Sequence, residues 1–147
     1  MVTDRDCRFC AIVGGDEHSH VVYEDEHSLA FLDHRPLFPG HSLLVPRDHF
    51  ETLAELPPEL LEPYFGAAQL LSRAIPRAME KPGSFVAMNN VVSQSVPHLH
   101  CHVVPRRRKD GLRGFFWPRR KYDGEEHIAE VAQTLRSTIA ELRGDGA

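Results

Sequence analysis

The feature that most constrains the fold is the run His-Leu-His-Cys-His-Val-Val-Pro-Arg at 98–106, in which histidines and apolar residues alternate. Strict alternation is the period of a β-strand, so we predict a strand over 98–104. Such a strand places the imidazoles of His98, His100 and His102 on one face and packs the intervening apolar residues on the other. Imidazole acts as a base, a nucleophile or a metal ligand near neutral pH, so this face is the candidate functional site.

The rest of the pattern predicts an α+β fold. Two short β runs at 21–23 and 28–33 flank four polar residues, which predicts a hairpin. Further strands are expected at 42–46 and 84–88. Hairpins without regular βαβ alternation indicate a five-stranded antiparallel sheet. One face of this sheet is left incompletely covered, and we place the histidines there.

Two helices are expected beside the sheet. The long one opens at 56–59, and its apolar residues recur at helical spacing. We expect a kink or a late start near Pro63 and a break near Pro76, because an internal proline removes a backbone donor and clashes with the preceding turn. The C-terminal helix is expected at 125–142. The residues expected to face the core from the long helix are Leu60, Leu61, Tyr64, Phe65, Ala68, Leu71 and Ile75.

Composition fits one globular domain over 1–147, with 41% hydrophobic and 26% charged residues. Within it we expect a core at 7–106, a basic aromatic loop at 106–123 and the C-terminal helix at 125–142. No apolar run reaches the ~18 residues of a membrane span, and the polar start of the chain lacks a signal-peptide core. A cytoplasmic protein without a membrane partner is therefore expected.

The net charge of −4 conceals a basic segment. Between 106 and 121 the chain carries eight Lys and Arg residues against the single acid Asp110. A basic segment that leaves the histidine strand indicates an anionic, phosphate-bearing ligand. We expect Arg106 to reach a phosphate as a bidentate donor. A longer phosphate chain would be served by Arg107, Arg108, Arg113 and Arg119.

The aromatic residues of this basic segment leave two interpretations open. They stack a second base or close over the pocket, or they pack against a partner subunit or the C-terminal helix. The residues concerned are Phe115, Phe116 and Trp117.

The three cysteines do not make a secreted disulfide framework. Two of them, Cys7 and Cys10, stand as Cys-x-x-Cys. In a reducing compartment such a pair is typical of a metal site or a redox motif. The redox interpretation is weaker, because no thioredoxin-like βαβ pattern surrounds the pair.

Three further motifs accompany the alternating run. Ser-Gln-Ser-Val precedes it at 93–96, Leu-Ala-Phe-Leu-Asp stands at 29–33, and Gly-His-Ser-Leu-Leu-Val-Pro-Arg-Asp-His stands at 40–49. Together these motifs resemble the histidine triad (HIT) family, and the likeness covers about 7–106. The resemblance implies a nucleotide-binding homodimer whose sheet continues across the subunit interface. It also implies hydrolysis or nucleotidyl transfer at the α-phosphate through a nucleotidyl-histidine.

The resemblance also assigns roles to single residues. His100 matches the nucleophile, His102 a contact to the α-phosphate or leaving group, and Ser95 a position that binds phosphate, ribose or the scissile bridging atom. In the branch of the family with Cys-x-x-Cys near the N-terminus, Cys7, Cys10, His49 and His98 resemble a structural zinc site. The residues expected to contact the nucleotide, with Arg106 added because of its charge, are Asp33, Phe9, Phe31, Leu32, Asn89, Gln94, His41 and Arg106. For Phe9 and Phe31 ordinary core packing remains the alternative, and for His41 a structural hydrogen bond.

Two other functions remain open. A metallohydrolase would use the triad histidines as metal ligands, but His98 and His102 lie ~13 Å apart on a flat strand, whereas Zn–N bonds are ~2.1 Å. A non-catalytic nucleotide sensor would keep His100 for binding alone, and turnover would distinguish it from an enzyme. Adenosine phosphoramidates and dinucleoside polyphosphates both fit as substrates, with a purine favoured. Nucleic acid is not an expected partner, because no DNA-binding domain accompanies the motif.

Overall fold

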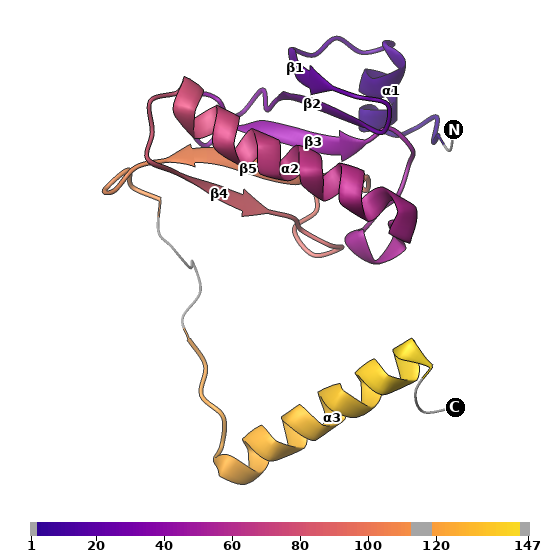
Figure 1. Ribbon diagram of the computed structural model, residues 1–147, viewed down its shortest axis with the longest axis vertical. Helices are drawn as coiled ribbons and strands as arrows, with labels where there is room; N and C mark the ends of the chain where they lie inside the picture. The colour runs from indigo at the N-terminus through magenta and orange to yellow at the C-terminus, as the bar shows by residue number, and fades with distance from the viewer. Residues whose placement is uncertain (1–2, 113–118, 145–147) are drawn as a thin grey trace. The chain divides into compact units, whose positions relative to one another are not determined.

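The structure, a computed structural model, describes residues 3–112 and 119–144. The chain divides into two units, Met1–Asp110 and Gly111–Ala147, which are described separately (Figure 1). The expectations for Arg113 and for Phe115, Phe116 and Trp117 lie outside the described residues.

The first unit is built on a five-stranded sheet with the strand order β1-β2-β3-β5-β4. All four neighbouring pairs of strands are antiparallel, which confirms the expected fold class. The strands are β1 (Val21–Glu24), β2 (Ser28–Leu32), β3 (Ser42–Pro46), β4 (Gly83–Ala87) and β5 (Cys101–Arg106).

The expected hairpin forms between β1 and β2, and Asp25 shapes its turn. Asp25 Oδ1 accepts the backbone N–H of His27 at 2.8 Å and that of Ser28 at 2.7 Å. Its Oδ2 accepts the hydroxyl of Tyr23 at 2.6 Å. An aspartate that bonds the backbone two and three residues on replaces the strand hydrogen bonds where the chain reverses. The turn thereby fixes the start of β2, whose other end reaches the cavity described below.

The long helix α2 (Pro58–Ala78) runs through both of its internal prolines. It does not start late near Pro63, and the expected break near Pro76 is wrong. Burial of one helix face outweighs the lost backbone hydrogen bonds, since Tyr64, Leu71 and their neighbours join the main core.

The buried face of α2 differs in part from the expected one. Tyr64 is 1% exposed, and its hydroxyl donates to the carbonyl of Leu44 in β3 at 3.0 Å. Ala67 is buried as well, although it was not among the expected core residues. Leu61 and Phe65 are 40% and 41% exposed, so these two expectations are wrong. The apolar stripe is therefore narrower than the sequence pattern indicated.

The histidine strand starts later than expected, because β5 begins at Cys101. His98 and His100 precede the strand, where the N–H of Leu99 donates to the carbonyl of Phe50 at 2.6 Å instead of joining the sheet. The alternating apolar residues are completely buried in the main core as predicted, and they are Leu99, Cys101 and Val103. The period of two thus holds for the whole segment. The apolar residues join the core with α2, whereas His98 and His100 both contact Phe9 of α1 and His102 stands beside His100, so the three histidines share the other face although the strand itself begins at Cys101.

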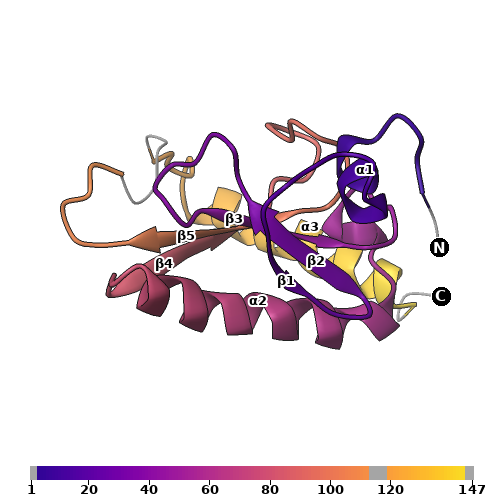
Figure 2. The same ribbon diagram turned by 90° about the horizontal axis from the view of Figure 1, so that it is seen from above.

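A short helix, α1 (Arg8–Gly14), lies on the opposite side of the sheet from α2 (Figure 2). Cys7 caps it, since its sulfur accepts the N–H of Cys10 at 3.4 Å. Gly15 ends it with a φ of 85°, a conformation that glycine adopts without strain. The buried residues Phe9, Cys10 and Ile12 pack with β2 and β3 to form a second apolar cluster.

The second unit contains α3 (Glu125–Arg143), close to the helix expected at 125–142. Gly144 follows it with a φ of 79° and caps its last turn. Among the residues that the structure describes, no helix is long and apolar enough to cross a membrane.

Candidate functional site

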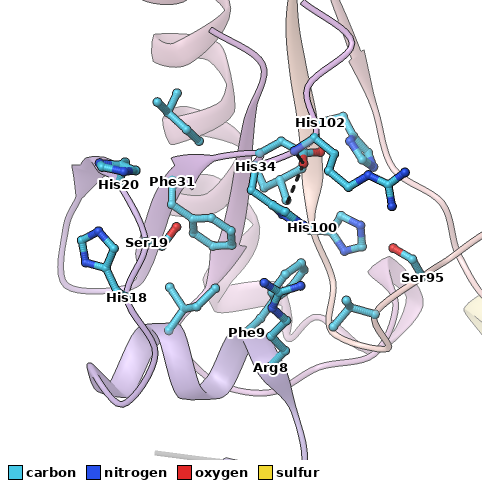
Figure 3. A pocket seen from close by; sticks show the side chains of 16 residues that line it. Arg8, Phe9, His18, Ser19, His20, Phe31, His34, Ser95, His100 and His102 are labelled. Carbon is cyan, nitrogen blue, oxygen red and sulfur yellow. Dashed lines mark hydrogen bonds and ion pairs between the residues drawn. The ribbon is translucent and has the colours of Figure 1, made fainter. Parts of the chain in front are cut away.

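A cavity of about 880 Å³ opens between α1, the end of β2 and the segment that enters β5 (Figure 3). Its walls are apolar around Phe9 and Phe31, and a histidine pair stands at one end. Seven of the predicted site residues line it: Phe9, Phe31, Leu32, Asp33, Ser95, His100 and His102. Four do not line it: Asn89, Gln94, His41 and Arg106.

His100 is held as a neutral imidazole with one free nitrogen. Its Nδ1–H donates to the carbonyl of His98 at 2.8 Å, which leaves the lone pair on Nε2. The ring is only 4% exposed, and burial lowers its pKa, although the bond to His98 and the charge of Asp33 partly oppose the change. A neutral ring with an unshared lone pair in a cavity can act as a nucleophile.

His102 stands beside His100 and is also held at Nδ1, but there it accepts a hydrogen bond instead of donating one. The backbone N–H of Leu37 donates to Nδ1 of His41 at 3.0 Å, so His41 carries its proton on Nε2. That proton is donated to Nδ1 of His102 at 2.9 Å, which leaves an N–H on Nε2 of His102. Burial first, and then the charges of His100 and His41, lower the pKa of His102 to about 4. His41 therefore acts behind the cavity wall, where it fixes the tautomer of His102.

Asp33 follows β2 and brings a carboxylate to the middle of the cavity. Its backbone N–H donates to the carbonyl of His41 at 2.9 Å, which ties it to the start of β3. Its Oδ1 accepts the N–H of Arg35 at 2.9 Å. The side chain is 17% exposed, so the carboxylate keeps access to the cavity. An ionised carboxylate only accepts hydrogen bonds, which suits a partner with hydroxyl groups.

The apolar wall is made of aromatic rings at right angles. Phe9 meets Phe31 with the ring centres 5.3 Å apart and meets His100 at 5.1 Å, both edge to face. Phe9 and Phe31 belong to the second apolar cluster and also line the cavity. These two rings therefore pack the fold and line the cavity at the same time.

Several cavity residues were not predicted from the sequence. Arg8 comes from α1, the loop before β1 contributes 18–20, and the loop after β2 contributes His34 and Arg35. Arg8 was detectable in principle, because it stands four residues before Ile12 and shares its helix face. The loop residues carried no periodic signal.

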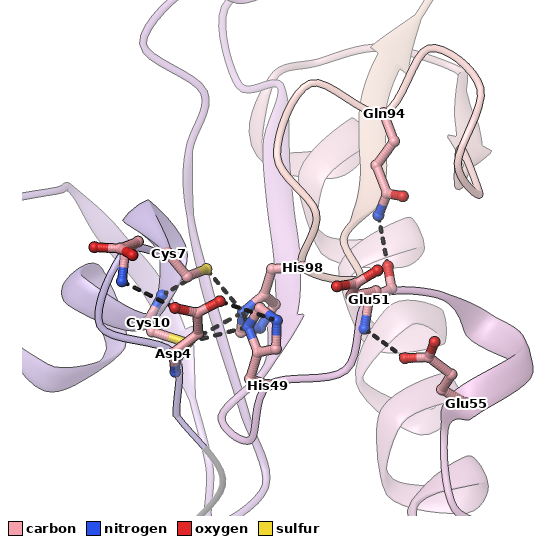
Figure 4. A network of polar contacts seen from close by, with 9 residues as sticks. Asp4, Cys7, Cys10, His49, Glu51, Glu55, Gln94 and His98 are labelled. Atoms are coloured by element: carbon pink, nitrogen blue, oxygen red, sulfur yellow. Dashed lines mark hydrogen bonds and ion pairs between the residues drawn. The ribbon is translucent and has the colours of Figure 1, made fainter.

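The loop before the triad is braced away from the cavity. Gln94 accepts the N–H of Val91 at 3.0 Å and donates from Nε2 to the carbonyl of Glu51 at 2.6 Å (Figure 4). Asn90 next to it accepts the N–H of Leu53 at 2.8 Å. Gln94 therefore supports the loop that carries Ser95.

Arg106 is committed to an ion pair. Its Nε and Nη2 donate to the two carboxylate oxygens of Asp110 at 2.6 and 2.9 Å, and this bond raises the pKa of Arg106. The side chain of Asp110 is 5% exposed. The expected bidentate arginine thus exists, but its partner is a carboxylate of the same chain.

Four predicted metal ligands converge beside the start of α1 (Figure 4). One donor atom from each lies within 4.8 Å of all the others. His98 Nδ1 stands 3.5 Å from the sulfur of Cys7 and 3.6 Å from that of Cys10. His49 Nδ1 stands 3.3 Å from the sulfur of Cys10 and 3.2 Å from His98 Nδ1. Two sulfurs and two ring nitrogens at these separations fit a tetrahedral zinc ion.

The proton positions in this cluster also suit a metal. His98 donates from Nε2 to the carbonyl of Pro46 at 2.9 Å, so its Nδ1 turns a lone pair toward the sulfurs. A ligand histidine whose other ring nitrogen donates to a carbonyl is the usual arrangement around bound metals. His98 thus faces the cysteines, whereas His100 and His102 face the cavity.

Known proteins are similar to this chain in sequence. The family described as HIT domain matches residues 15–109. "Protein hit" of Bacillus subtilis is 40% identical over 91% of this chain and 92% of its own. "Adenylylsulfatase HINT3" of Arabidopsis thaliana is 37% identical over 73% of this chain and 55% of its own. "Adenosine 5'-monophosphoramidase HNT1" of Saccharomyces cerevisiae is 31% identical over 96% of this chain and 85% of its own.

Solved structures agree. A protein from Streptococcus mutans superposes with a TM-score of 0.85 at 32% identity, over 93% of this chain and 87% of that one. A Zn-bound histidine triad family protein from Mycobacterium smegmatis gives a TM-score of 0.69 at 37% identity, over 95% and 97%. The sequence match, the five-stranded sheet and the histidine geometry agree, and the chain belongs to the HIT family.

Proposed function

We propose that this protein cleaves a purine nucleotide at the α-phosphate through a covalent intermediate on His100. The observation that carries the proposal is the bond from His100 Nδ1–H to the carbonyl of His98, which leaves Nε2 free inside the cavity. Relatives named adenylylsulfatase and adenosine 5'-monophosphoramidase support hydrolysis of adenylyl compounds.

The reaction runs in two displacements at phosphorus. The Nε2 lone pair of His100 attacks the α-phosphorus, and the bond from phosphorus to the leaving group breaks. The carbonyl of His98 then faces the Nδ1–H of a ring that has gained positive charge, which it stabilises. Water attacks phosphorus from the vacated side and gives up one proton to the solvent. The N–P bond breaks, which releases the nucleoside monophosphate and leaves His100 neutral.

Other cavity residues bind and orient the substrate. The Nε2–H of His102 donates to an α-phosphate oxygen or to the leaving atom, and His41 keeps it in that tautomer. The carboxylate of Asp33 accepts from the ribose hydroxyls, and the base enters the slot beside Phe9 and Phe31. Ser95, which lines the cavity near His100, supplies a hydroxyl to the phosphate.

We further propose that Cys7, Cys10, His49 and His98 hold a structural zinc ion. Their donor set and proton positions fit it, and the Zn-bound relative from Mycobacterium smegmatis supports it. The ion would cross-link α1 to the segment before β5 and would take no part in the chemistry, because four protein ligands leave no open position. The protein is also proposed to form a homodimer whose sheet continues across the interface, which sedimentation would test.

A metallohydrolase is disfavoured by the hydrogen bonds of the triad. His98 points to the cysteines, and His100 uses Nδ1 as a donor to a carbonyl. The three imidazoles therefore do not turn lone pairs toward one point.

The covalent intermediate gives the sharpest test. Wild-type protein mixed with adenosine 5'-phosphoramidate and quenched rapidly should gain the mass of one adenylyl group, mapped to His100. His100→Ala should gain none, should lose turnover by at least ~1,000-fold, and should bind AMP within about tenfold of wild type. Binding without turnover in the wild type would instead identify a nucleotide sensor, and an adduct on another residue would refute the proposed nucleophile.

A further inference from the structure

Two arginines line the cavity without a role in the mechanism above. Arg8 belongs to α1 and Arg35 to the loop after β2, so they come from separate elements. Asp33 is the one acid among the described residues that line the same space. The side chains that line the cavity therefore carry more positive than negative charge.

The guanidinium of Arg8 is held by one ion pair and keeps further hydrogen-bond donors. Its Nε donates to Oε1 of Glu17 at 2.8 Å, and the arginine side chain is 50% exposed. Within the described part of the chain, this is the hydrogen bond that its side chain makes. Figure 3 shows Arg8 rising from α1 beside Phe9 toward the space in front of His100. Both Nη groups remain as donors, and a guanidinium has no acceptor to offer.

Arg35 is fixed through its backbone, while its side chain stays available. Its N–H donates to Asp33 Oδ1 at 2.9 Å, so the residue is tied to the carboxylate in the middle of the cavity. Its side chain lines the cavity and forms no hydrogen bond or ion pair with the described residues. A second guanidinium thus stands within two residues of the proposed ribose contact.

Two of the arginines that the sequence suggested for a phosphate chain make contacts within their own segment. Arg106 is bound to both oxygens of Asp110. Arg107 donates from Nη1 to the carbonyls of Arg108 and Lys109 at 3.2 and 3.3 Å. Among the described residues, the arginines that line the cavity are Arg8 and Arg35.

We propose that Arg8 and Arg35 form a subsite for an anionic leaving group, so that the substrate is a nucleotide anhydride rather than a phosphoramidate. This inference rests on the proposed function, which places the α-phosphate at His100. A phosphate chain that leaves from phosphorus carries charge and planar acceptor edges that guanidinium groups bind in pairs, whereas an amine offers neither. The volume of about 880 Å³ lies in the upper part of the ~300–1,000 Å³ range of small-molecule sites, which leaves room beyond one mononucleotide.

The test compares two substrates that share the adenylyl half. We would measure kcat/KM for diadenosine tetraphosphate and adenosine 5'-phosphoramidate with wild type, Arg8→Gln, Arg35→Gln and the double variant. Arg73→Gln is the matched control, because Arg73 is exposed on α2, across the sheet from α1. Each single change should lower kcat/KM for the tetraphosphate about tenfold and for the phosphoramidate less than twofold. The tetraphosphate preference of the wild type should shrink as salt rises, because half-exposed charges are screened.

Equal losses on both substrates would overturn the inference, since the arginines would then contact the shared nucleotide half. No loss on either substrate would overturn it as well. A binding measurement separates this failure from failure of the proposed function. In His100→Ala, ATP should bind at least about tenfold more tightly than AMP, and the double arginine change should remove that advantage. AMP binding without any ATP advantage refutes the subsite alone, whereas absence of AMP binding refutes the nucleotide site itself.

Discussion

Two histidine clusters meet at the segment 98–102, and they are built for opposite purposes. In the cysteine cluster of Cys7, Cys10, His49 and His98, the Nε2–H of His98 donates a hydrogen bond to the carbonyl of Pro46, so the Nδ1 lone pair faces the sulfurs. In the cavity cluster, the N–H of Leu37 faces Nδ1 of His41, so donors and acceptors alternate through His41 to His102. The backbone group at the far ring nitrogen thus decides what each imidazole presents.

Distance alone does not separate the two clusters. One ligand atom each of Asp33, His41 and His102 also lies within 4.8 Å of the others, as in the cysteine cluster. A metal at His41 Nε2 would displace the proton to Nδ1, which would then oppose the N–H of Leu37. An unmade buried hydrogen bond costs about 1–3 kcal/mol. Proton positions, rather than spacing, therefore distinguish a metal site from a catalytic one.

The largest expected effect tests whether the clusters are independent. His100→Ala should abolish turnover by at least ~1,000-fold while zinc stays at wild-type stoichiometry, because His100 offers no ligand to the cysteine cluster. Steady-state kinetics and metal analysis on the same preparation check both halves. Loss of zinc together with activity would join the clusters and contradict the separation.

Next comes removal of one sulfur. Cys7→Ser should lose the zinc ion and lower the free energy of unfolding by about 4 kcal/mol or more, because metal binding free energy is part of folding free energy. Thermal unfolding and metal analysis measure the change. Cys101→Ala is the matched control, since Cys101 is equally buried but lies in the main core outside the cluster. A Cys7→Ser protein of undiminished stability would show that the cluster holds no structural metal.

A somewhat smaller effect follows from the buried cavity histidines. The pKa of His102 is about 4 in the fold and ~6.5 when unfolded, so the unfolded chain binds the proton more readily. Its contribution to stability is complete above pH 6.5 and is lost as pH falls toward 4, by about 3 kcal/mol for such a shift. Denaturant unfolding of wild type and His102→Asn across this window should show a shallower decline in the variant. Parallel curves would mean that His102 is not held neutral.

The smallest effect tests the hydrogen bonds that run from Leu37 through His41 to His102 and set the tautomer of His102. His41→Gln should lower kcat about tenfold and change KM little, because the amide retains one hydrogen-bonding group but does not fix the proton of His102 as firmly. At low pH a protonated His41 opposes protonation of His102, so replacing His41 should also raise the pKa of His102 and move the acid limb of the kcat profile to higher pH. A variant with reduced kcat and an unmoved profile would assign His41 a merely structural role.

Much of the sheet was predictable because alternation and turn residues are local signals. The hairpin around Asp25 and the strand at Ser42–Pro46 formed where the sequence indicated. The continuous helix through Pro63 and Pro76 was not predictable from the sequence, because the free energy gained by burying its apolar face depends on the assembled core.

The site was predictable through residues that the family motifs name, and less so elsewhere. Arg106 and Asp110 have the i,i+4 spacing of an ion pair, but the local sequence does not indicate whether the arginine binds this carboxylate or a ligand. Arg8 and Arg35 share a cavity only after α1 and β2 have packed together. His98 meets the sulfur of Cys10 only after α1 has packed beside the segment that enters β5.

The helix α1 has a consequence for how a new molecule matures. Cys7 and Cys10 at its start face the metal cluster, while Arg8, Phe9 and Ile12 line the cavity. A freshly synthesised chain that has not yet acquired its ion would lack the anchor of that wall. Binding of the ion would then be a step in maturation, and protein made without zinc would be inactive.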